Sequence, residues 1–257
     1  MMPLNDSRLP TLDQRLAARE RPSGKPVMFQ RWEELLFLHW AWDPQVLQAV
    51  LPPGLTIDTW DNRGWVGVVP FFMRNIRPVW SPVVPGVSHF LELNLRTYVF
   101  DAEGRPGVWF FSLEANQALA VILARRFFSL PYQHARMQAS SADGEVRYRS
   151  QRCGVASHSE FRYQGEGASR LAEPGSFEFF LVERYLLFSW QEKRRQLFSG
   201  QVVHPPYVIR DAGVAKGETD LFGLNDLDAP AGPPDHQLYS GGVDVEVFGL
   251  RPCRSAP

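Results

Sequence analysis

The chain has 257 residues, of which 44% are hydrophobic and 21% charged, and its formal net charge is -1 at pH 7. This composition predicts a globular protein with a substantial core, and the near-zero charge provides no field for a polyanion, so we expect no nucleic-acid partner. No apolar run approaches the roughly 20 residues that cross a bilayer, and the N-terminus lacks the apolar centre of a signal peptide, so we expect no membrane partner and a cytoplasmic location.

The chain divides into three predicted parts. Residues 1–27 are polar, with a short amphipathic stretch around Leu12 to Arg19, and are interpreted as an N-terminal arm packed on the surface or on a partner. Residues 28–250 are interpreted as a single domain, and residues 251–257 as a loose C-terminal tail.

The first element predicted after Met28 is a short helix. Asp43 is a capping residue followed by Pro44 at the first helical position, and the sequence from Leu51 to Gly54 ends the helix abruptly. Segments rich in β-branched and aromatic residues follow, separated by Asp, Asn and Gly turns. They predict strands at 55–60, 65–73, 89–100 and 107–114.

The second half of the chain predicts two more helices among strands. Residues 116–128 form a nearly all-apolar helix, capped by Asn116, which we expect to be buried, and a third helix runs from Ser176 to about Glu183. The sequence Ser141-Ala142-Asp143-Gly144 predicts a tight hairpin. The predicted strands cover 132–139, 144–151, 155–164, 185–190, 197–203, 206–210 and 238–248.

Many short strands with about three isolated helices predict a mainly β (α+β) fold. The expected architecture is an antiparallel sheet that closes into a barrel or cone around a cavity, with the helices plugging or flanking it. The inner face of one strand would then line a site for a small ligand.

The segment from Phe90 to Val99 indicates where that site lies. Side chains of a strand alternate between its two faces, so the leucines at 91, 93 and 95 share one face. The other face is polar and flanked by aromatic rings. It carries Phe90, Glu92, Asn94, Arg96 and Tyr98.

Further charged residues stand in apolar surroundings. Glu114 ends a predicted strand in which alternation places it with Phe110 and Ser112, and Arg125 and Arg126 end the second helix. Buried charges are normally paired, so such residues either form a structural network of ion pairs or form a site in which a carboxylate has a raised pKa. The sequence leaves both interpretations open.

Common catalytic and metal-binding signatures are absent from the sequence. It has no phosphate-binding loop, no dinucleotide-binding glycine pattern and no hydrolase elbow, and its two cysteines and six histidines are dispersed, so we expect no cofactor and no metal. The chain has only three lysines, Lys25, Lys193 and Lys216, as candidates for amine catalysis.

Several blocks together resemble the YqjF-like family of uncharacterised bacterial proteins, a likeness that covers residues 28 to 250. The most specific blocks are Glu92-Leu93-Asn94-Leu95-Arg96-Thr97-Tyr98-Val99 and the segment from Gly107 to Ala115. Shorter ones lie at Phe37-Leu38-His39-Trp40, Leu130-Pro131-Tyr132 and Glu183-Arg184-Tyr185. This resemblance implies no particular activity.

A more distant resemblance links the chain to acetoacetate decarboxylases. The segment from Asp43 to Leu55 is similar to their early helix, Phe90-Leu91-Glu92 to a YxE strand element, and the segment from Ala124 to Gln133 to a helix that ends GRExxGxPKK. The order and the gaps match, so the resemblance implies a cone-shaped or barrel-like antiparallel sheet around a hydrophobic interior.

The chemistry departs from that family. Its lysine pair after the proline supplies a Schiff-base amine, and here Tyr132 and Gln133 occupy those positions, while Arg126 replaces the acidic residue. Phenol and amide groups cannot form an iminium. The resemblance therefore implies the scaffold and not the mechanism.

Three functional hypotheses remain. In the first, the chain binds a small-molecule ligand, a partly apolar acid or ketone, through Glu92, Arg96 and Tyr132. In the second, it is a lysine-independent enzyme in which Glu92 is a general acid or base, Tyr132 polarises a carbonyl and Arg125 or Arg126 holds a carboxylate. In the third, the interior is filled core and the role is structural. The aromatic content of 13% also allows a homo-oligomer.

Overall fold

The computed structural model describes residues 9–254, and its strands form one continuous sheet. In chain order the strands are β1 (Met28–Trp42), β2 (Leu55–Ile57), β3 (Gly64–Pro78), β4 (Phe90–Asp101), β5 (Pro106–Ala115), β6 (Tyr132–Ala142), β7 (Glu145–Arg152), β8 (Ser159–Leu171), β9 (Leu186–Gln191), β10 (Gln196–Val203), β11 (Val208–Glu218), β12 (His236–Val247) and β13 (Arg251–Pro252). The helices are α1 (Leu12–Ala17), α2 (Pro44–Ala49), α3 (Ala118–Phe128) and α4 (Phe177–Val182).

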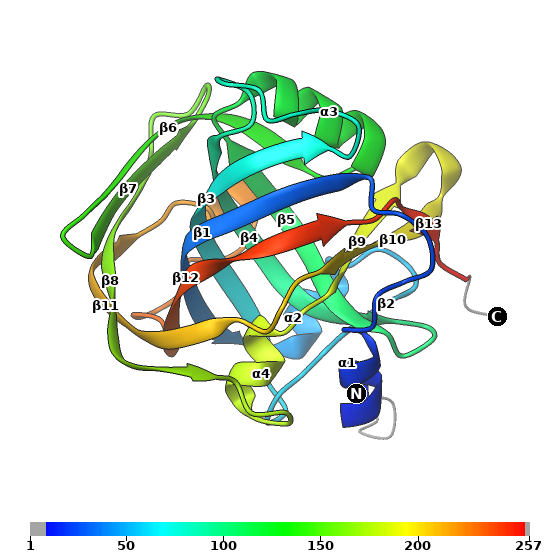
Figure 1. Cartoon of the computed structure of the whole chain (residues 1–257). Helices are drawn as coiled ribbons and strands as arrows, with labels where there is room; N and C mark the ends of the chain where they lie inside the picture. Colours follow the sequence, from blue (N-terminus) through cyan, green and yellow to red (C-terminus); the bar gives the residue numbers. More distant parts are fainter. Residues whose placement is uncertain (1–8, 255–257) are drawn as a thin grey trace.

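The sheet closes on itself. The pairings run β5-β6-β7-β8-β11-β12-β1-β3-β4, and β4 pairs again with β5, so these strands complete a ring. β5 also pairs in parallel with β9, and β10 pairs with β12, so a second path of strands leads from β5 back to β12. Figure 1 shows α3 at one end of these strands and α1 and α4 at the opposite end. The mainly β, partly closed fold predicted from the sequence is confirmed.

Two hydrophobic cores lie on opposite faces of β1, β3 and β4. The first core holds Leu91, Leu93 and Leu95 of β4 together with side chains of β6, β7 and β8 such as Tyr148. The second core holds Phe90 and Tyr98 of β4, with Phe37 of β1 and the buried residues of α4. β4 is therefore buried on both faces, which positions the polar side chains of one face inside the protein.

Local sequence signals explain several elements. Asp43 caps α2 by accepting from the Gln45 N–H at 2.8 Å, with Pro44 at the first position, as predicted. Asp143 and Gly144 both have positive φ, 52° and 81°, which gives the two-residue β6–β7 hairpin the backbone that follows strand twist. Ser176 caps α4 through the Phe179 N–H at 3.1 Å.

Strand β1 was not predicted from the sequence. Its burial pattern changes along its length, from half-buried residues at its start to fully buried ones from Leu35 to Trp40. A strand buried on both faces has no alternation of polar and apolar residues, so the period-two signal is missing from its central part. β1 is nevertheless central, since it pairs with both β3 and β12.

Helix α3 differs from expectation in its exposure and in its cap. Of its side chains only Val121 is buried, while apolar residues on its outer side are exposed: Leu119, Ile122, Leu123 and Phe127. The helix crosses over between the parallel strands β5 and β6, so it rests on the sheet with one side only. Gln117 caps it, and the Asn116 side chain instead accepts from the Leu91 N–H at 2.8 Å. No helix within residues 9–254 is long and apolar enough to cross a membrane.

The ends of the described chain are attached to the body. Helix α1 lies in the predicted N-terminal arm, and Arg15 pairs with Asp58 at 2.7 Å. Residues 1–8 of the arm and 255–257 of the tail lie outside the described residues. The start of the expected loose tail forms β13, which pairs with β10, and Cys253 is buried.

We predict that Gly107→Ala destabilises the fold by about 2 kcal/mol or more, because overpacking against backbone cannot relax by a side-chain rotation. A Cβ on Gly107 would lie 2.6 Å from the Leu186 carbonyl oxygen and 2.7 Å from the Phe188 ring, where β5 meets β9. Urea denaturation measures the change, and Gly232→Ala, whose Cβ meets nothing within 4 Å, is the matched control. Equal stability of the two variants would contradict the close approach of β5 and β9.

Candidate functional site

The polar face of β4 lies inside the protein, as the alternation predicted. Phe90 and Tyr98 belong to the second core, and Glu92 and Asn94 are each 4% exposed. In register, Glu92 lies opposite Phe71 of β3, Asn94 opposite Val69, and Arg96 opposite Gly67. These side chains form a line along β4 with aromatic residues at both ends.

Glu92 and Tyr132 are in contact. Tyr132 begins β6, next to Leu113 of the parallel strand β5, and its hydroxyl donates to Glu92 Oε2 at 2.6 Å. Burial raises the pKa of Glu92 from 4.5 to about 7, although hydrogen bonds from Tyr132 and Asn94 oppose the rise. Burial and the neighbouring Glu92 carboxylate raise the pKa of Tyr132 well above its usual value. The pair therefore combines a carboxyl group that titrates near neutrality with a phenol that keeps its proton.

Several buried polar atoms around this line have no hydrogen-bond partner among residues 9–254. We call five of them the open atoms: Arg96 Nε, Arg96 Nη2, Asn94 Oδ1, His39 Nδ1 and His236 Nδ1. All five belong to β4, β1 and β12, and His39 of β1 lies opposite His236 of β12. Buried polar groups are normally satisfied, so this concentration marks the interior face as a candidate binding site.

Arg96 has aromatic neighbours and no ion pair within the described part of the chain. Its guanidinium carbon lies 5.5 Å from the centre of the Phe37 ring and 5.7 Å from that of Tyr98. Its two open atoms, Nε and Nη2, point two parallel N–H groups along one side of the guanidinium plane. We call this side the open edge of Arg96. Such an edge matches the two oxygen atoms of a carboxylate.

His39 was not among the residues predicted for the site. It is fully buried, and its Nε2 lies 2.8 Å from the Tyr98 hydroxyl, so the predicted site residue Tyr98 has a partner from β1. Burial is the main reason that the pKa of His39 lies well below its usual value. A histidine in the apolar run Phe37-Leu38-His39-Trp40 was the only sequence signal for this position.

Glu114 lies on β5 next to β4, but not on the face of Glu92. A β-bulge between the pairs Leu95–Ser112 and Arg96–Phe110 breaks the alternation of β5, so Phe110 faces the second core while Ser112 and Glu114 face the first. The prediction that these three residues share a face is therefore wrong.

Glu114 also has its own partners. Arg152 donates to it at 3.0 Å and the Ser150 hydroxyl at 2.5 Å. Burial raises the pKa of Glu114, and these contacts oppose the rise. They make Glu114 part of a structural network on the other side of β4.

Arg125 and Arg126 lie on the exposed end of α3. Arg125 Nε donates to the carbonyl oxygen of Tyr132 at 2.5 Å, and its Nη2 to Gln133 Oε1 at 3.0 Å. Arg125 thus fixes the backbone that carries Tyr132, and the structure does not bring either arginine into contact with Glu92.

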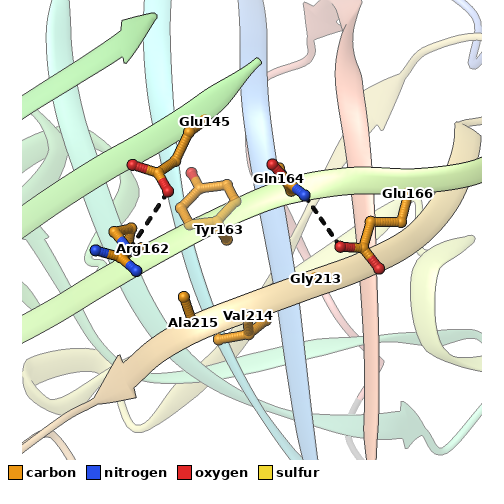
Figure 2. A pocket seen from close by; sticks show the side chains of 8 residues that line it. All are labelled: Glu145, Arg162, Tyr163, Gln164, Glu166, Gly213, Val214 and Ala215. Atoms are coloured by element: carbon orange, nitrogen blue, oxygen red, sulfur yellow. Dashed lines mark hydrogen bonds and ion pairs between the residues drawn. The ribbon is translucent and has the colours of Figure 1, made fainter. Parts of the chain in front are cut away.

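Two surface pockets lie away from the open atoms. Figure 2 shows one between β7, β8 and β11, where the Gln164 amide donates to Glu166 at 3.0 Å and Arg162 pairs with Glu145 at 3.4 Å. The other is lined by residues such as His204 and Arg31. Since the polar groups in Figure 2 already satisfy one another, this pocket is a weaker candidate than the interior face of β4.

Comparison with known sequences gives one family. The model of the DUF2071 family, described as an uncharacterized conserved protein, matches residues 29–244. The uncharacterized protein YqjF of Bacillus subtilis (strain 168) is 38% identical over 233 residues, which cover 90% of this chain and 94% of YqjF. The resemblance found in the sequence is confirmed.

Solved structures share the fold at low sequence identity. The enduracididine biosynthesis enzyme MppR complexed with pyruvate has a TM-score of 0.66 and 16% identity, covering 91% of this chain and 93% of MppR. Acetoacetate decarboxylase from Legionella pneumophila has a TM-score of 0.63 and 13% identity, covering 91% and 88% of the two chains. These similarities establish an acetoacetate-decarboxylase-like fold for the chain.

We predict that Glu92→Gln changes how stability depends on pH. The folded pKa of Glu92, about 7, exceeds its value of 4.5 in the unfolded chain, so its contribution to stability is present below pH 4.5 and is lost as pH rises through 7. Relative to the variant, the wild-type free energy of unfolding should fall by about 3 kcal/mol between pH 4.5 and pH 8. Urea denaturation of both proteins across this range measures the difference, and a difference independent of pH would show that Glu92 is not held in a desolvated environment.

Proposed function

The chain belongs to the DUF2071 family and has the fold of acetoacetate decarboxylases, and from this premise we propose that it binds a small, partly apolar keto acid on the interior face of β4, without a Schiff-base lysine. The observation that carries the proposal is the open edge of Arg96. A guanidinium in apolar surroundings without a counter-charge is costly, and a bound carboxylate would restore both its charge balance and its hydrogen bonds.

The carboxylate end of the ligand fits Arg96. Its open edge offers two parallel N–H donors, and the rings of Phe37 and Tyr98 flank the guanidinium, so the ligand meets one cationic group among apolar walls. This combination favours a small anion with little polar surface over a sugar or a phosphate. It agrees with the chemistry of MppR, which was solved with pyruvate, a keto acid.

The carbonyl end fits Glu92 and Tyr132. Glu92 stands four residues from Arg96 on the same face of β4, with Asn94 between them. Tyr132 keeps its proton, and its single O–H, which donates to Glu92 Oε2 in the absence of a ligand, would turn to the carbonyl oxygen when the ligand binds. Because the carbonyl carbon of a 2-keto acid is bonded to its carboxylate carbon, such a ligand meets both groups when the long Arg96 side chain extends along β4 toward Glu92.

The pKa of Glu92 near 7 favours a second candidate function, which is proton transfer without a lysine. As a carboxylate, Glu92 would take the proton from the carbon next to the carbonyl while Tyr132 donates a hydrogen bond to the carbonyl oxygen, giving an enolate. If the protonated Glu92 returned the proton to another carbon of the same molecule, the reaction would be an isomerisation; if it gave the proton to a hydroxyl on the carbon beyond the enolate, that C–O bond would break, water would leave, and the reaction would be a lyase step.

We predict that Arg96→Gln weakens the binding of 2-oxobutyrate by about 30-fold or more, since truncating one member of a buried charge pair costs about 2 kcal/mol or more. Isothermal titration calorimetry measures the affinity. Arg126→Gln is the matched control. Arg126 is exposed on α3, so this variant should bind 2-oxobutyrate as tightly as the wild type does. Equal affinities for the Arg96 variant and the wild type would overturn the proposal.

We also predict that borohydride treatment in the presence of 2-oxobutyrate leaves no reduced adduct on any lysine. Lys25 and Lys193 are exposed, and Lys216 pairs with Glu160 at 3.0 Å, so none of the three has the apolar surroundings that lower an amine pKa. Peptide mass spectrometry detects such adducts, with an acetoacetate decarboxylase treated in parallel as the positive control. A reduced adduct on any of these lysines would show that the chemistry depends on an amine.

A further inference from the structure

A row of residues crosses four strands beside the proposed carboxylate site. His236 of β12 pairs with His39 of β1, His39 with Gly67 of β3, and Gly67 with Arg96 of β4. Directly paired residues point to the same face of a sheet. The two histidines and Arg96 therefore lie on the same face of the sheet.

Gly67 is the place where these side chains meet. A Cβ there would lie 3.2 Å from the Tyr98 hydroxyl, 3.3 Å from the His39 ring and 3.5 Å from Cγ of Arg96. The three side chains thus converge over one residue that has no side chain of its own. The His39 ring and the aliphatic part of the Arg96 side chain thus lie on either side of Gly67, with no side chain of β3 between them at this position.

The histidine end of the row carries two open atoms that the keto acid described above does not use. They are Nδ1 of His39 and Nδ1 of His236, whose ring centres are 5.6 Å apart. Burial lowers the pKa of both histidines, so at neutral pH each ring is neutral and offers either an N–H group or a lone pair. An oxygen atom placed beside the two rings, at their Nδ1 edges, would hydrogen-bond to both.

The histidine end of the row is not fully enclosed. His39 is fully buried, but His236 is half-buried, and the half-buried ring of Phe177 covers it with ring centres 5.1 Å apart. Phe177 also packs on Trp65 at 4.6 Å. A ligand bound along the row would have its far end beneath this aromatic cover.

We propose that His39 and His236 form a second polar subsite, so the ligand is a short keto acid that carries an oxygen group at the end opposite its carboxylate. The inference rests on the proposed function, because Arg96 holds the first carboxylate. An acid with an apolar tail would leave both Nδ1 atoms buried without partners, whereas a terminal hydroxyl or carboxylate satisfies them. A site with buried polar groups discriminates strongly against the analogue that lacks the matching group.

The test compares three five-carbon probes by calorimetry: 2-oxopentanoate, 5-hydroxy-2-oxopentanoate and 2-oxoglutarate. They differ only at the terminal carbon. At least one of the two oxygen-bearing acids should bind the wild type about 10-fold more tightly than 2-oxopentanoate, and His236→Leu should reduce this ratio to near one while the affinity for 2-oxopentanoate is retained. His158→Leu, at a partly exposed histidine directly before β8, should keep the ratio.

Imidazole nitrogen NMR on the wild type gives a second readout that does not depend on a variant folding. The preferred probe should shift the Nδ1 resonances of His39 and His236, and 2-oxopentanoate should leave them in place. Equal affinities for the three probes, or a preference that His236→Leu leaves unchanged, would overturn the second subsite alone. If none of the probes binds the wild type, the proposed function itself fails.

Discussion

The interior position of β4 is the constraint on which the rest of the site depends. Its leucine face is buried in the first core, and on its other face, beside Phe90 and Tyr98 of the second core, Glu92 and Asn94 are buried and Arg96 is partly buried. A half-buried strand would turn these three polar groups toward water at no cost. Because this face of β4 lies inside the protein, the Glu92 carboxyl is desolvated, and this raises its pKa to about 7.

Other buried charges of the protein show what a structural solution looks like. The Asp58 carboxylate forms ion pairs with Arg15 and Arg184, each at 2.7 Å. These pairs attach α1 and the end of α4 to the rest of the domain. Glu183 accepts from the Tyr207 N–H at 3.0 Å and from the Tyr185 hydroxyl. Each of these carboxylates has at least two donors, and most of these donors come from distant parts of the chain.

Arg96 differs from those groups because the N–H groups of its open edge are buried and have no acceptor among residues 9–254. Folding brings carboxylates to Arg15 and Arg184 but not to Arg96, although Glu92 lies on the same strand. A fold that needed only internal ion pairs would place these two groups in contact. Their separation, with Asn94 between them, is the arrangement expected when a ligand completes the pairing.

The sequence predicted most of the scaffold, because its signals are local. The cap at Asp43, the Asp143-Gly144 turn and the alternation of β4 each depend on a few neighbouring residues, and each is present in the structure. The predictions that were wrong concern features that depend on contacts between distant parts of the chain. The bulge that turns Glu114 away from Glu92, and the exposure of α3, follow from how β5 meets its neighbouring strands.

The same limit applies to the site. Glu92 and Tyr132 could be predicted, since the motif order resembles the decarboxylases, and the structure places them in contact. His39 and His236 could not, because they are 197 positions apart in the sequence and only the pairing of β1 with β12 brings them together. Arg125 was predicted as a ligand contact, and it instead holds the backbone of Tyr132 from outside.

The phenol at position 132 limits the chemistry available to this residue. An amine there can form a covalent bond to a carbonyl carbon, but a phenol whose pKa lies well above its usual value can only donate to the carbonyl oxygen. The negative charge that develops on a ketone during proton removal must then be stabilised by hydrogen bonding alone. Glu92 has a pKa of about 7, which suits it to move that proton at neutral pH, whereas Arg96, four residues away on β4, is the group that the proposed function assigns to the carboxylate. The proposed proton transfer and the proposed charge pairing therefore depend on different side chains, and a substitution at either one tests its step separately.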